Sequence, residues 1–336
     1  ELNSNELSCA LLGVAAERGG CILDSCGVGY LGSHLMIAGI EPAEVHEISN
    51  ANPDETLEQF EQLLQKGRSA IFSISYDFGR KLQPTGTITP NSDEPDIFVA
   101  LFDTLAIHDY KNGKSFLIGN TAKFDLMQKL IRTARFEESK IADGSQIGSN
   151  FTRSEYLDAV EVIKENIRRG DTYQTNLTQQ SHAGLADGLN AETIFARLRR
   201  DHPAPFSAFL KRPGSTVVSA SPERFFKIEG QIISASPIKG TQKRGLTPEQ
   251  DAMLKSTLEA SEKDRAENTM IVDLLRNDLG RVCEYGSVVV EKLCEIETHP
   301  TFHHMVSTIN GQLNRGTSVS DILRALFPCG SITGAP

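Results

Sequence analysis

A helical pattern of apolar residues follows residue 150. Five of them fall at positions i, i+3, i+4, i+7 and i+11, the period of one face of an α-helix: Tyr156, Ala159, Val160, Ile163 and Ile167. Gly170 stands just beyond the last of them, where helices often end in a left-handed residue. The pattern therefore predicts an amphipathic helix that ends before Gly170.

Strand patterns occur on both sides of this helix. Short apolar runs at 70–74 and 97–101 indicate strands within a first region, residues 1–120, of mixed strands and helices. The polar stretch 137–148 contains glycine and serine and predicts a linker or a surface loop. Residues 172–180 alternate as a strand does, and the polar face of that strand carries Gln174, Asn176 and Thr178.

A β-hairpin is predicted between residues 224 and 237. Two β-rich runs flank the Glu-Gly dipeptide at 229–230, which is typical of a two-residue turn. Counting outward from this turn pairs Glu223 with Ser236, about 5 Å apart at Cβ. The hairpin is therefore expected to bring Glu223 and Lys239 to the same end of a sheet.

This glutamate and lysine have two interpretations. An exposed Glu–Lys pair at a sheet edge would be structural, and such pairs contribute about 1 kcal/mol or less. The Ser-Pro dipeptide before Glu223, and Gly240 after the lysine, mark backbone that turns tightly beside something else. The spacing alone favours the structural interpretation, whereas this context favours a functional site.

Two carboxylates and two apolar residues form a stripe on a helix predicted to begin near Ser261. Ser261 and Asp264 make an N-cap signature. The stripe consists of Asp264, Glu267, Ile271 and Leu274. Carboxylates that face a core need a partner, and oxygen ligands without nearby thiols or histidine pairs suit Mg²⁺. The alternative is that the helix dipole alone favours acidic residues at this end.

Two further stretches carry candidate chemistry, although each is a weak pattern. His303 and His304 precede an alternating strand pattern at 305–309, and a histidine at such a position is usually structural. The segment Cys329–Gly334 is rich in small residues, which would expose backbone N–H groups to an anion.

The composition is that of a globular protein with a large core: 39% of the residues are apolar, 23% are charged, and the formal net charge is −10. No basic stripe indicates nucleic-acid binding, no apolar stretch reaches membrane-spanning length, and no signal peptide opens the sequence. None of the six cysteines forms a C-x-x-C pair, so we expect free thiols in a reducing cytoplasm. We expect an N-terminal α+β region at 1–140 and a catalytic region at 150–336.

Nine stretches together resemble the chorismate-utilising enzymes, and most closely the component I subunits of aminodeoxychorismate synthase. The joint match is far more specific than any single motif, and it runs in family order over residues 70–336. The resemblance implies a large α+β fold in which two antiparallel sheets pack roughly orthogonally with helices outside. The stretches are FGRKL, RRGDTYQTNL, APFSAFL, SASPERF, SPIKGT, KDRAENTMIVDLLRNDLGR, GSV, HHMVSTI and FPCGSITGAP.

Two positions separate the members of this family. Anthranilate, salicylate and isochorismate synthases typically have alanine where Lys239 stands, and the water-adding members have a lysine base where Gln174 stands. Both residues imply amination of chorismate at C4 to 4-amino-4-deoxychorismate, in p-aminobenzoate and folate biosynthesis. Anthranilate synthase component I, an isochorismate or salicylate synthase, and a non-catalytic chorismate-binding homologue remain the alternatives.

The resemblance also implies a role for each site residue. Lys239 would attack C2 of chorismate while protonated Glu223 assists departure of the C4 hydroxyl. Mg²⁺, held by Glu267 with help from Asp264, would anchor the ring carboxylate. The residues that bind the substrate would be Gln174, Gly240, Thr241, His304, Gly330, Ser331, Thr333 and Gly334.

Partners and a second ligand are implied in the same way. Ammonia would come from a separate glutamine amidotransferase subunit. Some relatives bind tryptophan in the N-terminal sheet, as a feedback inhibitor or as a structural ligand. The matching positions here are Ser25, Pro205 and Phe206.

The sequence departs from the family pattern at two points. Cys329 stands where relatives usually have glycine, which crowds the loop slightly. After the Gly-Ala-Pro at 334–336 the family continues with a lysine, further metal-binding glutamates and substrate-binding stretches, so the C-terminal part of the fold is expected to be missing. We therefore expect that residues 1–336 alone do not turn over chorismate.

Overall fold

The computed structural model describes residues 2–83, 94–139, 146–299 and 302–335. It divides into two compact units: unit 1 consists of Glu1–Gln146 and Gly184–Pro222, and unit 2 consists of Ile147–Ala183 and Glu223–Pro336. The units are thus interleaved in sequence, which differs from the two continuous regions that we predicted. The reason is that two strands after residue 200 complete the sheet of unit 1.

Unit 1 contains five helices, one 3₁₀ turn and nine strands among its described residues. In chain order they are α1 (Ser4–Arg18), β1 (Gly20–Asp24), β2 (Leu35–Ile40), β3 (Glu44–Ile48), α2 (Pro53–Leu64), β4 (Ser69–Ile74), α3 (Tyr76–Leu82), β5 (Ile97–Phe102), β6 (Thr104–Asp109), β7 (Lys114–Gly119), η1 (Thr121–Lys123), α4 (Phe124–Thr133), α6 (Ala191–Asp201), β11 (Phe206–Arg212) and β12 (Ser215–Ser221).

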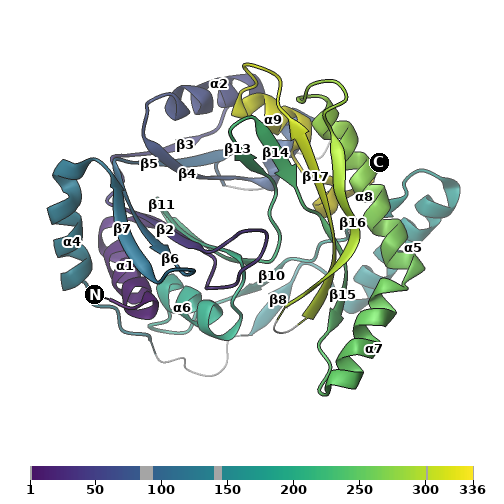
Figure 1. Cartoon of the computed structure of the whole chain (residues 1–336), viewed down its shortest axis with the longest axis horizontal. Helices are drawn as coiled ribbons and strands as arrows, with labels where there is room; N and C mark the ends of the chain where they lie inside the picture. The colour runs from purple at the N-terminus through teal and green to yellow at the C-terminus, as the bar shows by residue number, and fades with distance from the viewer. Residues whose placement is uncertain (1, 84–93, 140–145, 300–301, 336) are drawn as a thin grey trace. The chain divides into compact units, whose positions relative to one another are not determined.

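Two antiparallel sheets make up unit 1. The larger has the strand order β12-β11-β1-β2-β6-β7, and the smaller has the order β3-β5-β4. Helix α1 lies against β1 and β2 beside α4 and α6 (Figure 1), where Leu11, Phe195 and Phe209 belong to one buried cluster. Every residue of β5 is buried, which explains its continuous apolar run at 97–101.

Unit 2 carries all but three of the predicted site residues. Its elements in chain order are β8 (Ile147–Ser149), α5 (Arg153–Arg169), β9 (Gln174–Thr175), β10 (Ser181–Ala183), β13 (Lys227–Glu229), β14 (Ile232–Ala235), β15 (Ile238–Lys243), α7 (Pro248–Glu259), α8 (Glu262–Gly280), β16 (Val289–Thr298), β17 (Phe302–Gln312), α9 (Val319–Leu326), α10 (Gly330–Thr333) and β18 (Gly334–Ala335).

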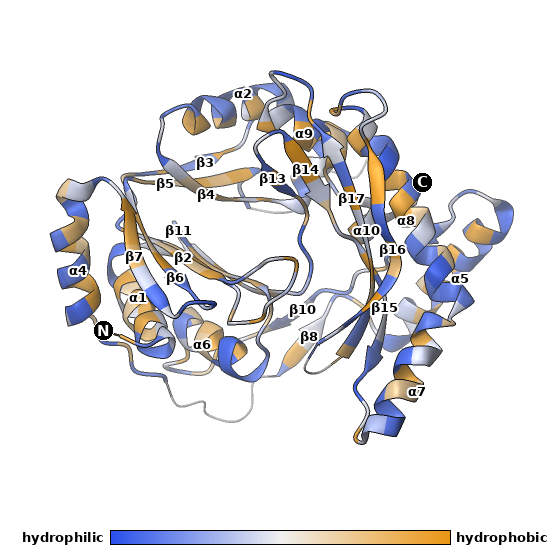
Figure 2. Ribbon diagram, viewed as in Figure 1, coloured by the Kyte–Doolittle hydropathy of each residue, from blue (hydrophilic) through white to orange (hydrophobic). Residues whose placement is uncertain are grey.

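The long strand β17 organises unit 2. Along one edge it pairs with β14 at residues 309–312 and with β15 at residues 302–306, so these two short strands lie end to end. Along its other edge it pairs with β16. Helices α8 and α9 cover the sheet, and apolar stretches of β14 and β16 are visible in Figure 2. The break between β14 and β15 directly precedes Ile238 and Lys239, the first two residues of β15.

A buried polar contact sets the rotation of α8 on this sheet. Asn268 is fully buried, and its side-chain amide donates to the Met305 carbonyl of β17 at 3.3 Å. The Ser307 hydroxyl of the same strand donates to the Asn268 side-chain oxygen. Because unpaired polar groups are costly in a core, these bonds hold one face of α8 inward. The carboxylate stripe lies beside that face and is only partly exposed.

Several sequence predictions are confirmed. The amphipathic helix exists as α5, and Gly170 caps it with φ 80° in the left-handed region. Helix α8 begins after an N-cap at Ser261, whose hydroxyl accepts from the Asp264 N–H. All six cysteines are free thiols. Within the four described ranges, no helix is long and apolar enough to cross a membrane.

The predicted hairpin register is wrong by two residues. Lys227 pairs with Ser234 and Glu229 with Ile232, so the turn consists of residues 230–231. The reason is Gly230, which has φ 61° and therefore occupies the first turn position, where a left-handed residue is needed. Glu223 consequently lies outside the ladder and does not pair with Ser236.

Two other predicted segments are shorter or more ordered than expected. Only Gln174–Thr175 of the stretch 172–180 forms a strand, because beyond Thr175 the neighbouring segment is helix α10 and no longer a strand. The predicted linker 137–148 ends in strand β8, where Ile147 pairs with Ala183, and its residues 140–145 lie outside the described residues.

Candidate functional site: a lysine and an acid around Ser331

Lys239 is held at the start of β15 by the segment that follows α9. Its Nζ donates a hydrogen bond of 2.7 Å to the backbone carbonyl of Ser331 in α10. The two residues are 92 positions apart in sequence, so only the packing of unit 2 brings them together. The side chain is partly buried, which sets it apart from a solvated surface lysine.

Glu223 lies beside the same serine. Its carboxyl group accepts hydrogen bonds from the Ser331 hydroxyl and from the Ile238 N–H, and it also feels the charge of Lys239. Burial outweighs these three contacts and raises the pKa of Glu223 above its ordinary value. A carboxyl group with a raised pKa is suited to donate a proton near neutral pH.

The structure brings Glu223 near enough to Lys239 for the lysine charge to act on its carboxyl group, but the hairpin does not cause this proximity. The ladder of the hairpin reaches only to Lys227 and does not include Glu223. In the structure this proximity depends on Ser331, whose hydroxyl contacts the acid and whose carbonyl contacts the amine. The family resemblance predicts only a substrate-binding role for Ser331, because contacts between such distant residues leave no local pattern in the sequence.

Gln174 is brought to the same segment by the pairing of β9 with β18. Ala335 is its partner in this ladder, and the Gln174 carbonyl approaches Gly334 so closely that a Cβ there would lie 2.1 Å from it. Gly334 has φ 120°, a conformation that also requires glycine. The buried side-chain oxygen of Gln174 has no hydrogen-bond partner among the described residues.

Gly240 and Thr241 link Lys239 to two other predicted site residues. Gly240 has φ 90°, and a Cβ at this position would lie 2.9 Å from the Cβ of Asp264 on α8. The Thr241 hydroxyl lies 2.9 Å from Nδ1 of His304 on β17. Strand β15 therefore places the lysine next to both the carboxylate stripe and the histidine.

His304 is neutral at physiological pH. Burial and, to a smaller extent, the neighbouring His299 lower its pKa to about 4. Its Nε2 is buried and has no hydrogen-bond partner in the described parts of the chain. Phe302 packs against the ring at a centroid distance of 4.2 Å. A neutral imidazole with one unused nitrogen can accept or donate a hydrogen bond to a ligand.

Each of the two carboxylates of the stripe already has one polar neighbour. Ser261 Oγ donates to Asp264 at 2.5 Å, and Lys263 Nζ lies 3.7 Å from Glu267. Their oxygens are the kind of ligand that Mg²⁺ prefers, and both are partly exposed. The described residues contain no group of three or more histidine, cysteine, aspartate or glutamate side chains that could hold a metal. The stripe thus fits a Mg²⁺ ion that takes its remaining ligands from water and substrate.

Substitution of Gly240 tests this close packing. Gly240→Ala is expected to lower the free energy of unfolding by about 2–3 kcal/mol, because it combines a left-handed alanine with a clash at Asp264. Gly316→Ala is the matched control, since Gly316 has φ 80° with open space around it and should cost only about 1 kcal/mol. Urea unfolding measures both. Equal losses would contradict the close approach of Gly240 to α8.

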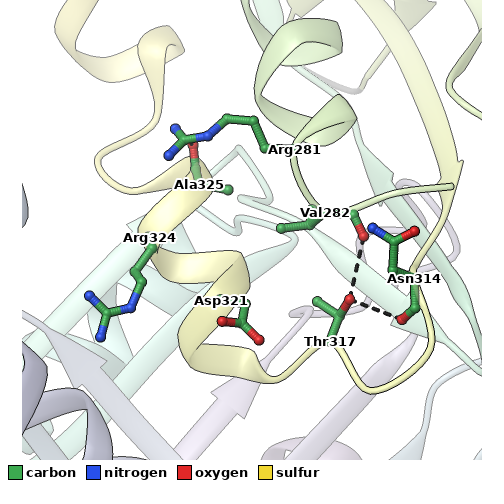
Figure 3. Close-up of a pocket in the computed structure, with 7 residues that line it drawn as sticks. All are labelled: Arg281, Val282, Asn314, Thr317, Asp321, Arg324 and Ala325. Atoms are coloured by element: carbon green, nitrogen blue, oxygen red, sulfur yellow. Dashed lines mark hydrogen bonds between the residues drawn. The ribbon is translucent and has the colours of Figure 1, made fainter. Parts of the chain in front are cut away.

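A separate pocket of about 270 Å³ contains none of the predicted site residues (Figure 3). It lies where the end of α8 meets the turn into α9, and several of its polar groups have hydrogen-bond partners. Thr317 Oγ1 donates to the Asn314 carbonyl at 2.9 Å, and Arg281 Nη1 donates to the Ala325 carbonyl at 3.3 Å. These bonds close the connection between β17 and α9. The lining residues are Arg281, Val282, Asn314, Thr317, Asp321, Arg324 and Ala325.

The three residues of the predicted tryptophan site lie together in unit 1. Ser25 directly follows β1, and the pairing of Asp24 with Ser207 places it near Pro205 and Phe206 at the start of β11. The Ser25 hydroxyl is buried without a hydrogen-bond partner in the described ranges. The neighbouring Asp24 is fully occupied, since it pairs with Arg199 at 2.7 Å and accepts from the Tyr110 hydroxyl at 2.8 Å.

Fold and site together define an α+β protein with a lysine–glutamate site at a sheet end and a carboxylate stripe on the covering helix. The sequence profile of the family described as chorismate binding enzyme matches residues 24–336. The chain therefore belongs to the chorismate-binding enzymes.

Named relatives of two kinds are similar to this chain. Aminodeoxychorismate synthase component 1 of Escherichia coli is 38% identical over 80% of this chain and 59% of its own length. Anthranilate synthase component 1 3 of Haloarcula marismortui is 35% identical over 89% of this chain and 66% of its own length. The chain thus spans roughly 59–66% of the length of these relatives.

A solved structure confirms the fold class. Anthranilate synthase component I from Streptococcus pneumoniae superposes with a TM-score of 0.80 at 23% identity, covering 91% of this chain and 75% of that one. The α+β class with antiparallel sheets and helices that we predicted is therefore correct.

Proposed function

We propose that this chain forms the chorismate-binding part of component I of an aminodeoxychorismate synthase. The observation that carries the proposal is the placement of Lys239 and Glu223 around Ser331. A surface ion pair would not need a partly buried acid with a raised pKa beside a partly buried lysine. Relatives named for this activity are 34–49% identical to the chain, which supports the same assignment.

The two residues supply complementary chemistry. In the proposed first step the Lys239 amine, once deprotonated, forms a bond to C2 of chorismate. The ring double bonds shift, the C4–O bond breaks, and Glu223 gives its proton to the departing hydroxyl, which leaves as water. In the second step ammonia forms a bond at C4, the double bonds shift back, and the C2–N bond to Lys239 breaks.

The surrounding residues would hold the substrate in place for these steps. Gln174 and His304 each present a buried polar atom without a partner among the described residues, and such atoms are suited to bind a ligand. Glu267 and Asp264 would hold Mg²⁺, which when bound neutralises a carboxylate of chorismate. The N–H groups of Gly240, Gly330 and Gly334 and the hydroxyls of Thr241 and Thr333 remain the proposed contacts to the substrate's carboxylates.

Ammonia and its source are further parts of the proposal. We infer that a glutamine amidotransferase subunit delivers ammonia, as the family resemblance implies. We also place the protein in the cytoplasm, where free thiols such as its six cysteines stay reduced. A tryptophan molecule near Ser25, Pro205 and Phe206 remains a proposal for unit 1, supported by the buried Ser25 hydroxyl.

The proposal is tested by the product formed from chorismate. The full-length protein that contains this sequence is incubated with chorismate, ammonia and Mg²⁺, and the product is identified by chromatography and mass spectrometry. We expect 4-amino-4-deoxychorismate, and we expect its formation to stop when EDTA removes the metal ion. Product formation that is insensitive to EDTA would contradict the assigned metal site.

Anthranilate synthase is the second candidate, because two of the similar relatives carry that name. The same assay separates the two activities, since anthranilate is an aromatic fluorescent product and aminodeoxychorismate is not aromatic. Formation of anthranilate would overturn the proposal. If neither product forms while chorismate binds in a metal-dependent manner, the chain is a non-catalytic chorismate-binding homologue.

A further inference from the structure

Ser331 contacts both proposed catalytic residues through different atoms. Its hydroxyl hydrogen-bonds the Glu223 carboxyl, and its backbone carbonyl accepts from Lys239 Nζ at 2.7 Å. A third residue, Cys329, places its Sγ 3.3 Å from the Ser331 hydroxyl oxygen. We propose that Ser331 is a positioning residue that couples the acid to the amine, and that Cys329 fixes the direction of its hydroxyl.

The direction of these bonds follows from counting protons. A serine hydroxyl has one proton, and an ionised carboxylate can only accept. When the Ser331 hydroxyl donates to Glu223, the remaining bond between Ser331 and Cys329 must therefore be donated by the Cys329 thiol. The backbone N–H of Ser331 donates a hydrogen bond to the Cys329 sulfur, and this bond holds the thiol in position to donate.

Protonation of Glu223 does not disturb this arrangement. The Ser331 hydroxyl can still donate to one carboxyl oxygen, which leaves the acid's own proton on the other oxygen. That proton is then directed away from Ser331 and is available to the substrate's leaving hydroxyl. The chain of hydrogen bonds from Cys329 through Ser331 to Glu223 thus determines which carboxyl oxygen of Glu223 carries the proton.

The segment that carries Ser331 is locked in position. The Ile332 and Thr333 N–H groups donate to the Cys329 carbonyl at 3.0 and 3.1 Å. Gly330 lies so close to Leu274 of α8 that a Cβ there would approach it to 2.1 Å. Ser331 is therefore one point of the packed turn that both Glu223 and Lys239 contact.

Four charged or titratable groups act within this cluster. Lys239 of β15 stabilises the ionised form of Glu223, as do the Ser331 hydroxyl and the Ile238 N–H. Burial raises the pKa of the Cys329 thiol, and the charges of Glu223 and of Asp278 on α8 raise it further. The thiol therefore stays protonated at neutral pH, which is the form that it needs as a donor.

The test measures the ionisation of Glu223 directly in the full-length protein. Glutamate side chains are labelled with ¹³C, the Glu223 signal is assigned with Glu223→Gln, and its chemical shift is followed against pH. We expect Ser331→Ala to raise the pKa of Glu223 by about one unit, because a charge-assisted hydrogen bond is lost. We expect Cys329→Ala to raise it by about 0.3 unit, since one cooperative donor is lost.

Two further variants make the test specific. Cys329→Ser should restore the wild-type pKa, because a hydroxyl donates as well as the thiol does. In the Ser331→Ala background, Cys329→Ala should have no further effect on Glu223. Cys9→Ala is the matched control, since Cys9 is an exposed thiol in α1 of unit 1. An equal effect of Cys329→Ala with and without Ser331, or no effect of any variant, would overturn the proposal.

The inference rests on the proposed function, but the two fail in different ways. The titration needs no substrate, so it can succeed even if the protein makes no aminodeoxychorismate. If the function holds, Ser331→Ala should lower kcat while KM for chorismate stays within about twofold, because the acid is misplaced and not the substrate. Cys329→Ser keeps the hydrogen-bond donor. If it loses as much thermal stability as Cys329→Ala does, Cys329 has a structural role only, and the proposal is overturned.

Discussion

Lys239→Ala is expected to abolish the formation of 4-amino-4-deoxychorismate by the full-length protein, with a loss of at least about 10³-fold in kcat. The physical reason is that the substitution removes the amine proposed to bond to C2, together with its contact to the Ser331 carbonyl. Chromatographic product analysis with chorismate, ammonia and Mg²⁺ measures the effect. Normal activity in this variant would rule out Lys239 as the nucleophile.

Two more variants separate nucleophilicity from charge. Lys239→Arg keeps a positive charge beside Glu223, but a guanidinium does not deprotonate in proteins and so has no free lone pair. It should be as inactive as the alanine variant if the amine attacks the ring. Lys243→Ala is the matched control, because Lys243 is exposed at the other end of the same strand, and it should keep wild-type activity.

Glu223→Gln is expected to lower kcat by about 100-fold to 10,000-fold and at the same time to stabilise the protein above neutral pH. The loss of activity follows because the amide cannot donate the proton that the leaving hydroxyl needs. The gain in stability follows from the raised pKa of Glu223, whose ionised form is disfavoured by burial. Steady-state kinetics and thermal unfolding from pH 4 to pH 9 measure the two effects.

The sign of the pH dependence is set by where the proton binds more tightly. The raised pKa means that the folded protein holds the Glu223 proton more tightly than the unfolded chain does. Its contribution to stability is therefore present below the unfolded-state pKa and is lost as pH rises through the folded-state pKa. Glutamine has no such proton, so the two unfolding curves should converge at low pH and separate at high pH.

Glu229→Gln is the matched control for this prediction. Glu229 is exposed in the neighbouring strand β13, and its hydrogen bond with Lys227 lowers its pKa instead of raising it. The control should leave activity unchanged and should not stabilise the protein at high pH. If Glu223→Gln is less stable than the wild type throughout the pH range, Glu223 is held as a structural carboxylate and not as a buried acid.

Local patterns predicted several helices and strands correctly. The stripe of apolar residues from Tyr156 to Ile167 predicted α5, and the N-cap signature at Ser261 predicted the start of α8. Such elements are predictable because capping, helical periodicity and strand alternation act between residues that are close in sequence. The length of the 172–180 strand was not predictable, since it depends on the distant segment that follows α9, where helix α10 replaces a strand partner beyond Thr175.

Register and domain membership were less predictable. A turn can shift by a residue or two without changing the hydrophobic pattern, and the left-handed Gly230 decided between the alternatives at 229–230 and 230–231. Strands β11 and β12 belong to the sheet of unit 1, although unit 2 residues precede and follow them in sequence. Pairing over such distances leaves no local signal.

The sequence by itself determined which kinds of residue the site contains, because the stretches around Lys239, Glu223 and Glu267 match one enzyme family in order. Tertiary structure alone decided how they meet. Ser331 lies 92 residues from Lys239, and the packing of unit 2 brings its hydroxyl to the acid and its carbonyl to the amine. Burial raises the pKa of Glu223, and burial depends on how distant segments pack around this residue, which its local sequence does not show.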